Sequence, residues 1–369
     1  MFMMPVPAWN HGLKDLKAKL AKDFPGLADE IEAIKLRQEL EQLDEPNSRE
    51  CLKLREAGNT FAPSVAELAG LDDEYSWRST CERARAGYEK GFFSFKQLSG
   101  LSEGEKLWLT RSSALECYEA NRGGNGYAPS FEQLAAETGE DSKFYLSSHY
   151  AFNCYEQKQK HHAIFPSWEE LKALPKAKQE VLVWPKNVRV GGPDDFRCYK
   201  MRAEGNKFAP TFYDLKDLSP DLIKALTVQQ ARLCYEACHE GNEFAPSFDD
   251  LKDLSLDLIA ELTNRDALEC YKMRAQGNEF APSFDDLKGL TEEEMQRLTD
   301  FSARECYKLR KEGNEFAPSF DDLKEIDLDK VSSLTSIYSV ICYKRRKEGN
   351  EFALSFEDLK ELPLEMIFQ

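Results

Sequence analysis

The sequence has 369 residues but neither a long apolar run nor an excess of positive charge. A helix that crosses a membrane needs about 20 consecutive apolar residues, and because no stretch approaches that length we expect no membrane insertion. The 49 Lys and Arg residues stand against 66 Asp and Glu residues, which gives a net charge of −17. Affinity for nucleic acid depends largely on cations that neutralise phosphates, so the composition disfavours nucleic acid as a partner.

Signatures of export and of catalysis are also missing. The opening stretch from Met1 to Pro5 has neither the basic region nor the apolar core of a secretory signal. The sequence contains no G-x-S-x-G, no H-E-x-x-H and no glycine-rich phosphate loop. We therefore expect no catalytic residues and no enzyme activity.

Metal and cofactor sites lack their usual ligand spacing. The five histidines are His11, His149, His161, His162 and His239. Cys234, Cys238 and His239 come nearest to a ligand set because positions i and i+4 share one helix face, but a third ligand on that face is missing. The sequence thus predicts no bound metal and no cofactor.

The sequence does contain a repeat, which is marked by cysteine. Five cysteines follow one another at intervals of 36 residues, and each precedes a tyrosine: Cys198, Cys234, Cys270, Cys306 and Cys342. Four more continue the register towards the N-terminus at less regular intervals: Cys51, Cys81, Cys117 and Cys154. We therefore expect about nine units, each of which starts at one of these cysteines.

The unit that begins at Cys270 shows how each repeat is built. A Gly-Asn pair at Gly277 ends a helix, because glycine accepts the left-handed conformation that closes the last turn. Ser283, Thr291 and Thr299 each stand where a helix N-cap is expected. The pattern predicts two short helices and one long helix, and the long helix runs to the next stop at Gly313.

Units of this kind cannot bury an apolar face alone, so they stack on their neighbours. The sequence predicts an all-α fold, namely an α-solenoid that forms a right-handed superhelix. Residues 1–50 hold charged, Leu-rich segments suited to an N-terminal helical cap, and residues 51–369 form the repeat array. An insertion near 184–193 contains two Pro and two Gly, which predicts a surface loop or a hinge.

The marker cysteines lie on a stripe of small residues along the long helix. Ala303, Cys306 and Tyr307 occupy positions i, i+3 and i+4, which share one helix face. Matched positions on helices that pack about 8–10 Å apart between axes seldom meet the geometry of a disulfide. We expect buried, reduced thiols and hence a reducing compartment, the cytoplasm.

The length and the three-helix unit resemble Pumilio-type RNA-binding repeats, and the stacking resembles tetratricopeptide and HEAT arrays. The motif here is C-Y-x-x-R-x-x-G-N-x-F-A-P-S-F-x-D-L, and it contains none of the side-chain signatures of those families. No family is assigned on this basis.

An arginine recurs four residues after the marker cysteine, as in Arg274 and Arg310. It stands opposite recurring acids such as Asp285 and Asp321. One interpretation is a ladder of Arg–carboxylate bridges between units. The other is a row of arginines that holds acidic or phosphorylated groups of a ligand.

The positions that differ between units point to a binding surface. Near-identical copies diverge in the three residues after the third cap, where the long helix starts, and these include the following pairs: Gln229 and Gln230, Arg265 and Asp266, Phe301 and Ser302, Ile337 and Tyr338. One explanation is random sequence drift at positions without a constraint. The other is a surface that recognises a different group of the partner in each unit. Large apolar residues such as Phe301 are unexpected on a solvent-exposed face that has no binding role.

The leading functional prediction is a non-catalytic scaffold or adaptor that binds a protein or peptide along the repeats. The variable pairs, together with Arg274 and Arg310, are its candidate binding residues. The alternative is a single-stranded RNA-binding repeat protein, which the charge of −17 disfavours.

Overall fold

The computed structural model describes residues 34, 46–64, 67, 84–183 and 194–367. Every regular element in these residues is an α-helix, which confirms the all-α class. The chain divides into two compact units, Met1–Phe152 and Asn153–Gln369. Most of the predicted cap, the marker Cys81 and the insertion near 184–193 lie outside the described residues.

Short and long helices alternate in the first unit as the sequence predicts. The helices are α3 (Pro46–Glu56), α6 (Phe95–Ser99), α7 (Glu103–Leu109), α8 (Ser112–Arg122), α9 (Phe131–Ala135), α10 (Glu140–Leu146) and α11 (His149–Lys158), which ends in the second unit. The short helices α7, α9 and α10 contact one another, and the long helix α8 packs on α7.

The described residues of the second unit form five complete long helices with two short helices between successive ones. The long helices are α14 (Asp194–Ala203), α17 (Gln229–His239), α20 (Arg265–Ala275), α23 (Phe301–Lys311) and α26 (Ile337–Lys347). The first short helices are α12 (Trp168–Lys172), α15 (Phe212–Leu215), α18 (Phe248–Leu251), α21 (Phe284–Leu287), α24 (Phe320–Lys324) and α27 (Phe356–Lys360). The second short helices are α13 (Lys176–Val183), α16 (Pro220–Thr227), α19 (Leu256–Thr263), α22 (Glu292–Thr299), α25 (Leu328–Leu334) and α28 (Leu364–Ile367).

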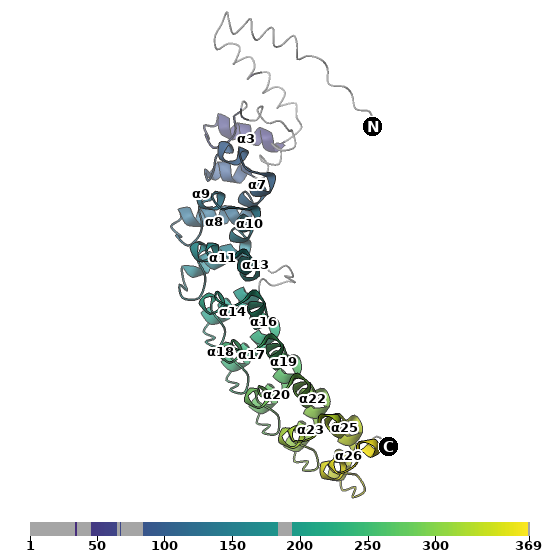
Figure 1. The fold of residues 1–369 in the computed structure, drawn as a ribbon. Helices are drawn as coiled ribbons and strands as arrows, with labels where there is room; N and C mark the ends of the chain where they lie inside the picture. Colours follow the sequence, from purple (N-terminus) through teal and green to yellow (C-terminus); the bar gives the residue numbers. More distant parts are fainter. Residues whose placement is uncertain (1–33, 35–45, 65–66, 68–83, 184–193, 368–369) are drawn as a thin grey trace, which may run out of the picture. The chain divides into compact units, whose positions relative to one another are not determined.

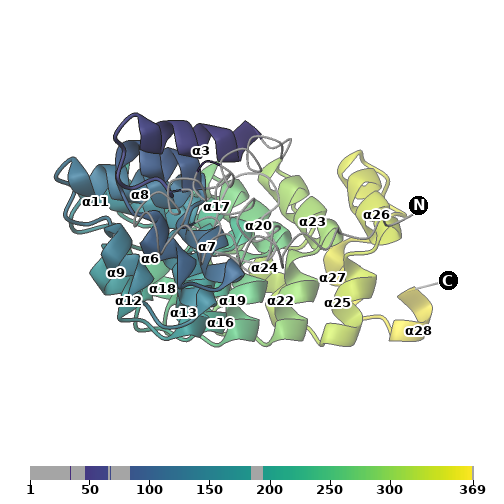
Figure 2. The ribbon, with the colours of Figure 1, turned by 90° about the horizontal axis from the view of Figure 1, so that it is seen from above.

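Equivalent helices of successive repeats form two rows within the second unit. Figure 1 shows α16, α19, α22 and α25 in one row and α17, α20, α23 and α26 in the other. Viewed from above in Figure 2, the first short helices α24 and α27 lie between the rows and pack against α22 and α25. Each repeat thus presents one long helix on the same side of this unit.

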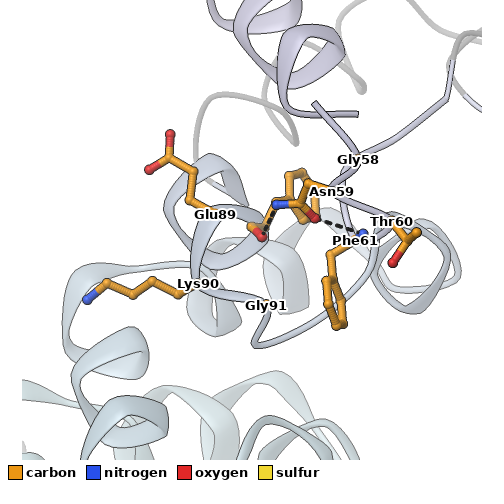
Figure 3. A pocket seen from close by; sticks show the side chains of 8 residues that line it. Gly58, Asn59, Thr60, Phe61, Glu89, Lys90 and Gly91 are labelled. Atoms are coloured by element: carbon orange, nitrogen blue, oxygen red, sulfur yellow. Dashed lines mark hydrogen bonds between the residues drawn. The ribbon is translucent and has the colours of Figure 1, made fainter. Parts of the chain in front are cut away.

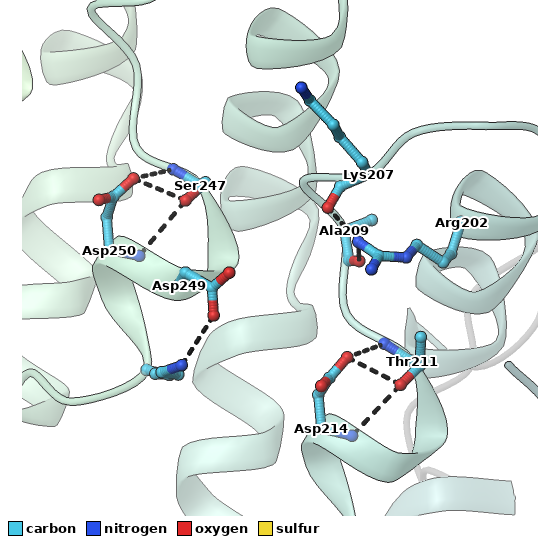
Figure 4. Close-up of polar contacts among 9 residues, drawn as sticks. Arg202, Lys207, Ala209, Thr211, Asp214, Ser247, Asp249 and Asp250 are labelled. Atoms are coloured by element: carbon cyan, nitrogen blue, oxygen red, sulfur yellow. Dashed lines mark hydrogen bonds and ion pairs between the residues drawn. The ribbon is translucent and has the colours of Figure 1, made fainter. Parts of the chain in front are cut away.

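The first two predicted caps are confirmed. Ser283 accepts a hydrogen bond from the backbone of Asp286, whose carboxylate accepts one in return from the Ser283 backbone at 2.8 Å. Thr291 forms the same reciprocal box with Glu294. Figure 4 shows the equivalent boxes at Thr211 and Ser247. Each box satisfies two backbone donors that a helix start would otherwise leave unpaired.

The third predicted cap is wrong by one residue. Thr299 is the last residue of α22, and its hydroxyl donates 2.8 Å back to the carbonyl of Met295. Asp300 caps α23 instead and accepts from the backbone of Ala303 at 2.7 Å. Threonine has both a donor and an acceptor, so a threonine between two helices can close the first instead of opening the second.

The long helices end and pack as the sequence predicts. Gly277 and Gly313 both have a φ of +81°, the left-handed conformation in which other residues are strained. The marker Cys270 and its neighbour Tyr271 are fully buried, and the Tyr271 hydroxyl donates 3.0 Å to the Leu262 carbonyl in α19, the short helix that precedes this long helix. This bond ties the long helix to the second short helix.

The marker cysteines are free thiols throughout the described residues. All of them except Cys342 are buried, which confirms the predicted core position. Burial disfavours the thiolate and raises the pKa of Cys270 to about 12. These thiols are therefore packing groups with little nucleophilic character.

Successive repeats are joined by polar bonds that the sequence analysis did not foresee. Asn278 is buried, and its Nδ2 donates 3.1 Å to the carbonyl of Tyr307 in the next repeat. Its Oδ1 accepts from the Phe280 backbone at 3.2 Å. A second bond runs from the Phe284 backbone to the carbonyl of Phe244 at 2.9 Å. Both bonds recur at equivalent positions along the second unit.

Candidate partner-binding surface on the long helices

Three of the predicted binding residues are highly exposed apolar side chains. Phe301 and Ile337 each have 67% of their surface exposed, and Tyr338 has 74%. Phe301 and Ile337 are the first residues of α23 and α26. At this exposure most of each side chain is open to solvent and is not packed on the next repeat.

The other variable residues divide into two groups. Gln229, Gln230 and Arg265 are exposed, whereas Asp266 and Ser302 are partly buried. Asp266 pairs with Arg304 of the next repeat at 2.8 Å. Asp194 and Arg232 form the same pair two repeats earlier. Where an acid occupies the second position of the variable pair, it therefore forms an ion pair between repeats.

One face of each long helix carries the first variable position and two more residues that change between repeats. These lie at i, i+4 and i+7, a spacing that places them on one side of a helix. We call them the long-helix stripe: Gln229, Leu233 and Glu236 on α17; Arg265, Glu269 and Lys272 on α20; Phe301, Glu305 and Lys308 on α23; Ile337, Ile341 and Lys344 on α26. The sequence analysis found only the first of these positions, although comparison of the copies at i+4 and i+7 would have found the others.

Arg274 and Arg310 lie off this stripe. Arg310 donates to the carbonyl of Glu315 and, at 3.1 Å, to that of Ala317 in the loop that follows its own helix. Its guanidinium lies 5.7 Å from the ring of Phe280 in the preceding repeat. Arg274 makes the equivalent contacts, and Figure 4 shows the same clamp at Arg202.

The predicted ladder of Arg–carboxylate bridges is therefore wrong. Asp285 pairs with Lys288 of its own helix at 2.6 Å, and Asp321 pairs with Lys324 at 2.7 Å. The arginine is drawn instead to backbone carbonyls, because the loop after each long helix leaves these acceptors without a helical donor. The contact between repeats is a guanidinium stacked on a phenylalanine ring.

A hollow of about 380 Å³ lies on the stripe between α14 and α17. Its lining combines both charges with apolar groups, from Arg197, Lys200, Met201, Glu204, Gln229, Arg232, Leu233 and Glu236. Leu233 is 36% exposed and supplies apolar surface within it. The hollow is open and mixed in polarity, so it suits a side chain of a partner better than a small apolar ligand.

A second hollow, of about 270 Å³, lies in the first unit between the loop at 58–61 and the end of the helical segment at 88–91 (Figure 3). Asn59 spans it with Nδ2 donating 2.7 Å to the Tyr88 carbonyl and Oδ1 accepting from the Phe61 backbone at 2.9 Å. These are the bonds that join repeats elsewhere in the chain. The hollow is thus a joint between a loop and a helix end, held by the two bonds of Asn59.

Chemistry beyond packing is sparse on this surface. No group of three His, Cys, Asp or Glu side chains in the described part of the chain is arranged to hold a metal ion. Cys238 donates its thiol proton to the Ala245 carbonyl at 3.1 Å, which is the place of the arginine clamp in other repeats. Among the described residues, no helix is long and apolar enough to span a membrane.

Comparison of the chain with protein-family models, with curated proteins and with solved structures finds no match. The functional argument therefore depends on the surface itself.

Proposed function

We propose that the protein is a non-catalytic scaffold that binds a protein or peptide partner along the long-helix stripe. The observation that carries the proposal is the 67% exposure of Phe301 and Ile337 at a position that is polar in Gln229 and Arg265. Burial of one such side chain against a partner contributes about 1.5–3 kcal/mol. Exposed aromatic and aliphatic anchors of this kind dominate the energy of interfaces.

We further propose that the repeats form an α-solenoid with a right-handed superhelix, in a reducing cytoplasmic environment. The recurring bonds from Asn278 to Tyr307 and from Phe284 to Phe244 support the stacked array, because each connects neighbouring repeats. Such an array presents equivalent helices side by side, so one extended partner contacts several of them.

Single-stranded RNA is disfavoured as the partner by the stripe as well as by the net charge. Glu236, Glu269 and Glu305 lie on the stripe of three successive helices. Carboxylates at these positions repel a phosphate backbone that runs across the helices. Binding to random RNA that weakens steeply with salt would favour RNA over a protein partner.

Site-specific photo-crosslinking tests the proposal in cells that express the full chain. A photoreactive amino acid at position 301 or 337 is expected to capture the same protein partner, because the two positions share one face. The matched control places it at the exposed Asp257 of α19, which lies off the stripe. Equal capture at all three positions, or capture only at 257, would contradict the proposed surface.

A further inference from the structure

We propose that the part of the stripe on α23 and α26 binds a short peptide segment that carries apolar side chains next to one or two carboxylates. This inference rests on the proposed function and specifies the chemistry of its ligand. It concerns five side chains: Phe301, Lys308, Ile337, Ile341 and Lys344.

The apolar component comes from the first two stripe positions. Phe301 and Ile337 are equally exposed at 67%, although their helices α23 and α26 pack against each other. Ile341 is 41% exposed, close to the 36% of Leu233 at the same position on α17. On α20 the two positions hold Arg265 and Glu269, so the fold accepts charge there and does not require apolar residues.

The positive component comes from the third stripe position. Lys272 pairs with Glu269 at 3.0 Å, and Lys308 pairs with Glu305 at 2.7 Å. Ile341 replaces that glutamate on α26, so Lys344 has no ion-pair partner among the described residues. A carboxylate of a bound peptide would supply the missing partner beside an apolar contact, where water screens the pair less.

The charge beyond this position limits how acidic the ligand can be. Glu312 and Glu348 follow α23 and α26 as their C-caps, and both are exposed. Their charges offset those of the exposed Lys311 and Lys347 that precede them, so these pairs add little net positive charge beyond the stripe lysines. The ligand chemistry that fits is therefore an apolar segment with one or two acids, rather than a polyacidic tail.

Helix spacing sets the separation of the apolar side chains in the ligand. Packed helices lie about 8–10 Å apart. An extended polyproline-type segment advances about 3.1 Å per residue and returns to the same face every third residue. Side chains three residues apart in such a segment would meet Phe301 and Ile337 in turn.

Selection from a display library of random 12-residue peptides on the full chain tests the inference. The selected peptides are expected to be enriched in apolar residues three apart and in Asp or Glu beside them. Their affinity is expected to fall at least tenfold for the triple variant Phe301→Arg, Ile337→Gln and Ile341→Glu. These substitutions install residues that sister repeats carry at Arg265, Gln229 and Glu269, so folding should be retained.

A charge variant and its control complete the test. Lys344→Gln is expected to weaken the same peptides about fivefold, and about 0.5 M salt should reduce that difference. Lys224→Gln on α16 is the matched control, because Lys224 is an exposed lysine off the stripe that pairs with Asp221, and it should leave affinity unchanged. Selected peptides that are basic, or that bind the triple variant equally but lose affinity on Leu233→Glu, would overturn this inference while leaving the proposed function standing. Selection of no peptide, or of peptides insensitive to every stripe variant, would overturn both.

Discussion

Asn278 donates a hydrogen bond of 3.1 Å from Nδ2 to the backbone carbonyl of Tyr307, which lies in the next repeat. The Asn278 side chain is 1% exposed, and its Oδ1 also accepts a hydrogen bond from the backbone N–H of Phe280 in the turn that follows the helix. One buried amide thus links the end of one long helix to the middle of the next. The bond explains why asparagine follows the helix-ending glycine in repeat after repeat.

Replacement of Asn278 by alanine is expected to lower the free energy of unfolding by about 1–3 kcal/mol, because it leaves buried backbone groups without a partner. Asn350→Ala is the matched control. Asn350 accepts the same turn bond from Phe352 at 3.0 Å but is exposed. Urea unfolding of both variants measures the difference, and an equal loss would show that the cross-repeat bond adds nothing to the turn bond.

Thiol labelling of the native protein tests the packing of the long helices. Cys270 is fully buried, and burial raises its pKa to about 12, so it should react slowly at pH 8. Cys342 is only partly buried and serves as the internal reference. Mass spectrometry of the labelled peptides should show Cys342 modified first. Preferential labelling of Cys270, or a melting temperature that changes with reductant, would contradict the packing described for α20.

Burial of Asp195 predicts that the stability of the second unit depends on pH. The Asp195 side chain is 2% exposed, and Oδ2 has no hydrogen-bond partner among the described residues. Burial, with a smaller contribution from Asp194, raises the pKa of Asp195 well above its usual range. The folded state therefore keeps a proton that the unfolded chain loses above about pH 4, and stability falls as pH rises from there.

Asp195→Ala installs the residue found at Ala231, Ala267 and Ala303 in the sister repeats. We expect it to raise the free energy of unfolding at pH 7 by about 1–3 kcal/mol and to have a smaller effect at pH 4. Urea titrations at the two pH values measure the change, with the exposed Asp257→Ala as control. A benefit that is the same at both pH values would contradict the assignment to the buried carboxyl.

Local signals in the sequence were enough to predict most of the repeat. The all-α class, the first two caps and the buried thiols follow from patterns within a few residues, such as Ser283 followed by Asp286. The third cap was missed because Thr299 and Asp300 are both good caps, and only the backbone geometry decides between them. The Asn278 bond was missed because its acceptor, the Tyr307 carbonyl, lies 29 residues away and is a backbone group that leaves no trace in side-chain patterns.

The candidate binding residues could be predicted only in part, because contacts with residues far along the chain leave no local signal in the sequence. Divergence between copies identified Phe301 and Ile337 without any structure. It did not show that Asp266 is engaged by Arg304 of the next repeat. Arg310 was offered as a ligand-binding group, but pairing rules between charged side chains cannot reveal that loop carbonyls and the Phe280 ring hold it.

The central claim is that the stripe on the long helices binds a partner and does not stabilise the fold. The most direct test measures the melting temperature and the partner affinity of one variant, Phe301→Ala with Ile337→Ala. Both side chains are at least two-thirds exposed, so the melting temperature should stay within about 2 °C of the wild type. Affinity for the crosslinked partner should fall by about 2 kcal/mol or more. A destabilised protein that retains its intrinsic affinity would contradict the claim.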